Sequence, residues 1–86
     1  MMKGTVFSVN STTCMVAVQT EDGEFTVFEL LENEPVAPGD DVEWKDGASL
    51  GPVVVTDYRL KRVFEAFFHA HHLTRMEVSQ QLVTQE

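Results

Sequence analysis

Turn-forming residues interrupt roughly the first sixty positions of this chain about every 8–12 residues, and the segments between them are short and largely apolar. Segments this short are marginal as helices but suit strands that pair through tight turns. Asp22-Gly23 is a strong hairpin signal, because both residues tolerate a positive φ. Pro35, Pro38 and Gly39 mark a connection that cannot continue a sheet. The predicted strands cover residues 5–9, 14–18, 25–31, 41–45 and 53–56.

These strands predict a mainly β fold, with a small five-stranded barrel over residues 1–58. The alternation around Val42 and Trp44 predicts that both side chains point inward. Residues 59–86 are expected to form a helical tail that packs on the barrel. A chain of 86 residues is too short for a second hydrophobic core, so barrel and tail should form one cooperative domain.

In the tail, the spacing of apolar residues changes from two to about 3.6, which predicts two C-terminal α-helices. Thr74 and Glu77 have the spacing of a capping box, and Leu73 and Val78 that of a hydrophobic staple. The second helix should therefore begin at Arg75. The apolar stripe of the first helix would contain Leu60, Val63, Phe64, Phe67, Ala70 and His71, with Phe68 at its edge.

The acidic charge of the chain is concentrated in the predicted barrel. The formal net charge is −8, and residues 20–57 contain eleven acidic residues against a single base, Lys45. Because phosphate backbones bind mainly to cationic side chains, nucleic acid is not an expected partner. The acidity is interpreted first as a source of solubility and second as a docking surface for a basic protein partner. No apolar run approaches the roughly 20 residues that span a bilayer, so no membrane association is expected.

The chain shows no pattern of catalytic residues. Cys14 is the single cysteine, so an internal disulfide is excluded and a cytoplasmic location is expected. Its place in an apolar strand predicts an inert thiol in the core, and Phe7 is expected to be core as well. The acidic pairs lie on turns, where solvation is the expected role. We therefore expect no enzyme activity and no cofactor.

Four segments follow one another in the order found in a known family. Gly4–Asn10 resembles the motif G-x-V-K-W-F-N, and Val27–Leu31 resembles V-F-V-H-F. Pro38–Glu43 resembles G-x-x-V-x-F, and Gly51–Val55 resembles G-P-x-A-x-x-V. Over residues 3–58 the chain thus resembles the cold-shock domain, a form of the OB-fold. The resemblance implies an OB-like barrel and, in the family, binding of single-stranded nucleic acid on exposed aromatic rings.

The residues that bind nucleic acid in that family are largely lost. Phe7–Val9 stands in place of K-W-F, residues 13–18 stand in place of K-G-F-G-F-I, and only Phe28 remains of F-V-H-F. Each lost stacking ring removes roughly 1–3 kcal/mol of binding free energy per base. The barrel is therefore interpreted as one whose nucleic-acid face has been dismantled.

The first functional hypothesis is a non-enzymatic protein-interaction or regulatory module, either monomeric or homodimeric. Apolar replacements on the sheet and the stripe of the tail would form its interaction face. The tail helix could lie across this sheet face or plug the open end of the barrel. The candidate face contains Met15, Phe28, Leu30, Phe64, Phe67 and Phe68.

Two alternatives belong to other classes of protein. The first is a single-stranded nucleic-acid binder of the cold-shock type. Its contacts would come from Phe28, Arg59, Lys61 and Arg62. The second is a weak metal-binding protein through His69 and His72, which would be i,i+3 neighbours on a helix and offer half of a metal site.

Overall fold

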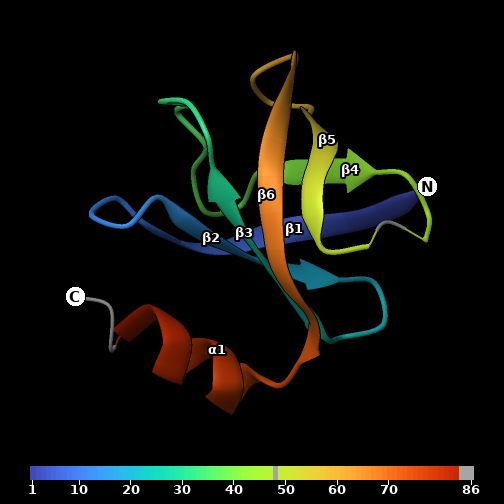
Figure 1. Ribbon diagram of the computed structural model, residues 1–86. Coiled ribbons are helices and arrows are strands. Elements are labelled where there is room, and N and C mark those ends of the chain that lie inside the picture. The colour runs from blue at the N-terminus through green and yellow to red at the C-terminus, as the bar shows by residue number, and fades with distance from the viewer. Residues whose placement is uncertain (48, 84–86) are drawn as a thin grey trace.

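The computed structural model describes residues 1–47 and 49–83, the last three of them through their backbone only. The described chain forms six strands and one helix (Figure 1). The strands are β1 (Met2–Asn10), β2 (Met15–Thr20), β3 (Phe25–Leu30), β4 (Asp41–Trp44), β5 (Gly51–Asp57) and β6 (Arg62–Leu73), and the helix is α1 (Arg75–Val83). The strands close into an antiparallel barrel in the order β1-β2-β3-β6-β5-β4. The mainly β class is thus confirmed, but the barrel has six strands rather than five.

The prediction of a helix directly after the fifth strand is wrong, because this segment is β6. Figure 1 shows β6 between β3 and β5, and it pairs with both along most of its length. Phe64, Ala66 and Phe68 alternate inward, whereas Val63 and Glu65 face outward. A helix here would leave the edges of β3 and β5 unpaired, so barrel closure overrides the weaker helical spacing. The described part of the chain therefore has one helix rather than two.

The core of the barrel is built around stacked aromatic rings. Phe68 of β6 stacks on Phe28 of β3 with ring centroids 5.1 Å apart, and Trp44 meets Phe68 edge-on at 5.2 Å. Val42 and Trp44 both point inward, as their alternation predicts. These rings join β3, β4 and β6. The interior therefore depends on β6, the segment for which the spacing of apolar residues predicts a helix.

β1 coils so strongly that it pairs with β2 along most of its length and with β4 at its start. Gly4 lies where these two pairings overlap. A Cβ at this position would lie 2.4 Å from Cγ1 of Val18 and 2.8 Å from the carbonyl oxygen of Gln19. Both distances are far below van der Waals contact, so the close approach of β1 to β2 requires glycine here.

Two residues predicted for the core lie outside it. The register between β1 and β2 shifts between Val6 and Ser8, and this bulge turns Phe7 to the outer surface. Its ring meets Phe25 edge-on there, with centroids 5.1 Å apart. Cys14 is exposed and has φ 62°, because it lies in the tight turn before β2 rather than in the strand.

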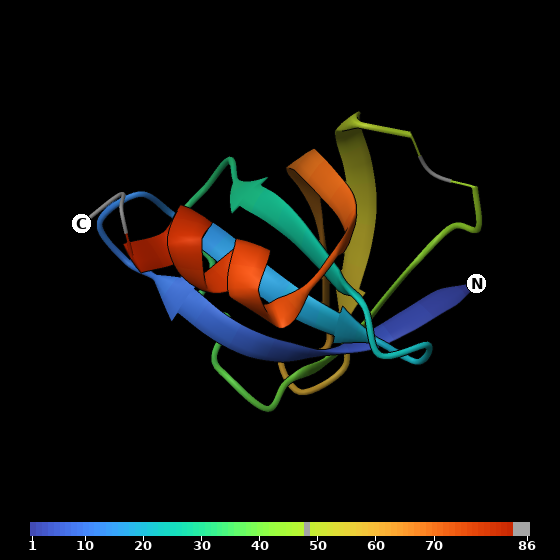
Figure 2. The ribbon, with the colours of Figure 1, turned by 90° about the horizontal axis from the view of Figure 1, so that it is seen from below.

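α1 covers the outer surface of β2 and β3 (Figure 2). It begins at Arg75, as the capping box predicts: the Thr74 amide donates to Glu77 Oε1 at 2.9 Å, and the Glu77 amide donates to Thr74 Oγ1 at 3.2 Å. Val78 is fully buried, and Leu73 packs against the same cluster. The covered face, as we name the surface beneath α1, contains Met15, Ala17, Phe25 and Val27.

Within the described residues, α1 is far too short and too polar to cross a lipid bilayer.

Candidate functional site

The six residues of the predicted interaction face do not form one exposed surface. Phe28, Leu30, Phe64 and Phe68 point into the barrel, and Met15 lies under α1. Phe67 alone is substantially exposed. The reason is the strand at residues 62–73, which orders its side chains with a period of two and sends alternate phenylalanines to the interior.

A different apolar surface is exposed on the outer side of β5 and β6. Val63 is 66% exposed, Val54 57% and Phe67 39%, and Pro52 is exposed beside them. The register places Pro52 opposite Phe67 and Val54 opposite Glu65, so these side chains share one face of two paired strands. We name this surface the open face, defined by Pro52, Val54, Val63, Glu65 and Phe67.

The open face is held in place by the turn that joins β5 to β6. Asp57, at the end of β5, is fully buried, and its Oδ1 accepts a hydrogen bond from the Leu60 amide at 3.1 Å. Burial raises the pKa of Asp57, and the neighbouring carboxylate of Asp40 raises it further. Burial would also raise the pKa of Asp40, but hydrogen bonds from the Arg59 guanidinium and the Ala37 amide favour its charged form, and that pKa is lowered. The Asp57 carboxylate thus holds the turn that joins the two paired strands of the open face.

Carboxylates lie beside the apolar side chains of the open face. Glu65 lies within the open face. Glu32 and Val63 both line a cleft of about 320 Å³ at the border of the open face. Glu34 lines the same cleft but is buried, and its carboxylate pairs with Arg62 at 3.2 Å. Arg62, which lines the cleft, is therefore already paired, whereas Glu32 and Glu65 remain exposed.

Three of the four residues proposed for nucleic-acid binding are buried or paired within the protein itself. Phe28 is fully buried and has no ring surface to offer a base. Arg59 pairs with the buried carboxylate of Asp40 and donates to the carbonyl oxygen of Pro35 at 2.7 Å. Arg62 is held by its ion pair with Glu34. Of this set, Lys61 is exposed in the turn before β6 and takes part in none of these contacts.

The histidines of β6 do not form the pair expected on a helix. His69 Nε2 lies 3.0 Å from Glu29 Oε1, and His72 Nδ1 lies 2.8 Å from Glu24 Oε1. Each imidazole thus has its own carboxylate. The i,i+3 proximity of His69 and His72 disappears because the segment is extended rather than helical.

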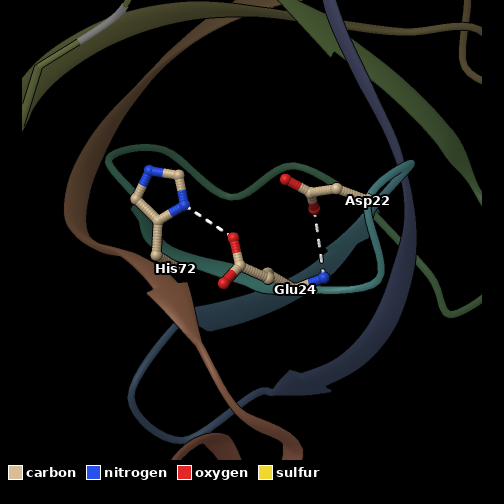
Figure 3. A group of neighbouring side chains, drawn as sticks. All are labelled: Asp22, Glu24 and His72. Carbon is tan, nitrogen blue, oxygen red and sulfur yellow. Dashed lines mark hydrogen bonds and ion pairs between the residues drawn. The ribbon is translucent and has the colours of Figure 1, made fainter.

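A mixed cluster of possible metal ligands lies instead at the hairpin between β2 and β3 (Figure 3). Ligand atoms of Asp22, Glu24 and His72 lie within 4.8 Å of one another, and all three residues are exposed. The hydrogen bond with Glu24 and its negative charge raise the pKa of His72. Hydrogen bonds from the Thr20 hydroxyl and the Glu24 amide lower the pKa of Asp22. Among the described residues this set could hold a divalent cation, at the expense of the Glu24–His72 ion pair.

The residues of the open face could have been found from one signal in the sequence. Val53, Val54 and Val55 are consecutive, so one β-branched apolar side chain must point away from the barrel interior. The outward position of Val63 and Phe67 follows only once the segment is known to be a strand. The comparisons with known proteins give no further guidance: no protein-family model, no curated protein and no solved structure matches this chain.

Proposed function

We propose that this protein is a non-enzymatic interaction domain that binds a partner protein through its open face. The observation that carries the proposal is the cross-strand group of Val54, Val63 and Phe67, which leaves apolar side chains in water on the paired strands β5 and β6. Apolar groups clustered in this way typically mark a binding surface. The closed barrel is compatible with a cold-shock-like domain that has lost nucleic-acid binding, and we propose a cytoplasmic location for it.

The burial of Phe28 and the ion pairs of Arg59 and Arg62 support a protein partner over a nucleic acid. A phosphate backbone would have to replace these internal ion pairs against a net charge of −8. Titration with a labelled single-stranded oligonucleotide at low salt should therefore leave the amide spectrum unchanged. Saturable binding that weakens with salt would instead support a cold-shock-type activity.

The proposal is tested by placing a charge on the open face. The double variant V63D/F67D should lose a partner that the wild type captures from extract, because a carboxylate cannot be desolvated in an apolar interface. Both side chains are outward, so the circular dichroism spectrum should stay unchanged. Met76 is also exposed, on α1, and M76D is the matched control that should retain the partner. Equal capture by both variants would contradict the proposed surface.

A weak divalent-cation site is a second candidate function, favoured by the convergence of Asp22, Glu24 and His72. Two carboxylates and one imidazole suit Mn²⁺, Ni²⁺ or Zn²⁺, with water completing the coordination. Titration with Ni²⁺ should broaden amide signals of the β2–β3 hairpin, and H72A should abolish this response. H69A serves as the matched control. Broadening that survives in H72A would contradict the assignment.

A further inference from the structure

The closed barrel restricts how a partner can bind at the open face. Each of the six described strands pairs with a neighbour on both sides, so the barrel offers no free edge along these pairings. The pairing of β4 with β5 covers only Val55–Asp57 of β5, so an added strand would find at most a short edge, whereas a partner that docks through side chains can use the whole open face. Such a partner must have its own backbone hydrogen bonds satisfied internally. An α-helix meets this requirement, because its amide and carbonyl groups pair within the segment.

The molecule itself contains an example of such docking. α1 has nine residues and lies across the outer surface of β2 and β3, where it buries Val78 against four apolar side chains. The outer wall of this barrel thus accepts a short helix through the apolar side chain of Val78. The open face has the same composition of β-branched and aromatic side chains, at Val54, Val63 and Phe67, but α1 does not reach it.

The charges around the open face indicate the sign of the charge that a binding partner carries. Glu65 lies between the apolar side chains, and Glu32 lies at the cleft beside Val63. Arg62, the cation at the same cleft, is held by Glu34. A second copy of the chain would bring the same carboxylates and a further net charge of −8 to this surface. Charge complementarity therefore favours a cationic occupant over self-association.

Building on the proposed function, we infer that the occupant of the open face is a basic amphipathic helix of a partner protein. Its apolar residues, at spacings of three and four, pack on Val54, Val63 and Phe67. Its lysine or arginine side chains lie beside Glu65 and Glu32. Apolar contacts set the affinity in this arrangement, while the carboxylates select the charge of the helix.

The probe is a synthetic helical peptide of about four turns, with leucines along one face and lysines beside them. An otherwise identical peptide with glutamates in place of the lysines is the matched control. The lysine peptide should shift the amide signals of β5 and β6, and the glutamate peptide should not. In V63S, which leaves the net charge unchanged, affinity should fall at least about tenfold. Binding that is unaffected by V63S would mean charge attraction alone and would overturn the inference.

A charge reversal tests the role of Glu65 directly. In E65K, the affinity for the lysine peptide should fall and that for the glutamate peptide should rise, because the central charge changes sign. An unchanged preference would overturn the assignment of a basic partner. A Val63-dependent dimer, seen by sedimentation at low micromolar concentration, would identify a second copy as the occupant and also overturn it.

The inference can fail while the proposed function stands. Loss of the extract partner in V63D/F67D, with no response of β5 and β6 to the lysine peptide, would retain the interaction face and reject the basic helix. An intact partner complex in V63D/F67D would reject both.

Discussion

Among the described residues, the outer wall of the barrel carries two apolar patches, the covered face beneath α1 and the open face, whose side chains remain in solvent. On the covered face, α1 seals Met15, Ala17, Phe25 and Val27 from water. On the open face, Val54, Val63 and Phe67 keep much of their surface in solvent. The two patches are similar in chemistry, so the difference lies in what the same chain places on top of them.

The covered face behaves as an extension of the core. Burial of its residues beneath α1 stabilises the folded protein by about 25 cal/mol per Å² of apolar surface removed from water. The apolar surface of the open face would give the same kind of hydrophobic free energy only when another molecule binds and removes it from water. A substitution on the covered face should therefore change stability, and one on the open face should change binding.

Truncation of the largest side chain on the covered face should be the most damaging change. Phe25→Ala should lower the free energy of unfolding by about 3–5 kcal/mol, because it leaves a cavity under α1 and removes the edge-on contact with Phe7. Urea denaturation followed by circular dichroism measures the change. Phe67→Ala on the open face is the control, and a loss of similar size there would erase the distinction between the faces.

The buried residue of α1 should have the next largest effect. Val78→Asp should cost about 2 kcal/mol of stability, since the helix must undock to hydrate the new carboxylate. The amide signals of Met15, Ala17 and Val27 should shift while the barrel stays folded. Unchanged signals on β2 and β3 would show that α1 contributes nothing to covering this face.

The cap of α1 should contribute less than its buried residue. Thr74→Ala removes the hydroxyl that accepts the Glu77 amide and should destabilise the protein by about 1 kcal/mol. Thr74→Ser retains the hydroxyl and serves as the control. Thermal denaturation of the three proteins should rank Ser close to the wild type and Ala below both. Equal melting temperatures would indicate that the capping box is dispensable.

The open face should tolerate a polar substitution within the free protein. Val63→Ser changes a side chain that is 66% exposed, so stability should stay within about 0.5 kcal/mol of the wild type. The same urea titration as for Phe25→Ala provides the measurement. A loss above about 2 kcal/mol would show that this surface is part of the fold and would remove it as a docking site.

The smallest effect concerns the pH dependence of the segment that leads into α1. Glu24 raises the pKa of His72, so their ion pair contributes stability below the unfolded pKa of histidine and loses it as the pH rises through the folded pKa. The ring-proton titration of His72 should have a midpoint above that of an unstructured histidine peptide. Glu24→Gln should bring the midpoint back, and an unchanged midpoint would show that Glu24 does not raise the pKa of His72.

The sequence alone predicts those structural features that depend only on residues close together in the chain. The inward positions of Val42 and Trp44 follow from alternation, and the start of α1 follows from the chemistry of Thr74 and Glu77. Both features depend on residues only a few positions apart. Local spacing therefore specifies them without knowledge of the rest of the fold.

Local rules fail where a distant strand decides the outcome. Phe64 and Phe67 are three positions apart and fit a helix face, yet β6 is a strand because β3 and β5 both need a partner. Phe7 fits an alternating core position until the bulge in β1 turns it outward. The open face was hidden for the same reason: Val63 is an outward residue only if the segment is extended. These errors arise from long-range pairing, which has no signature in a short window.

The position of β6 between β3 and β5 also determines when the barrel can close during synthesis. Five strands leave the ribosome before the sixth, and until it follows them both β3 and β5 have an unpaired edge. Phe28 meanwhile lacks the ring of Phe68 that stacks on it in the finished core. A nascent chain in this interval exposes apolar surface and open strand edges, the features that promote aggregation. Translation speed around β6 and access to chaperones should therefore govern the yield of folded protein in the cell.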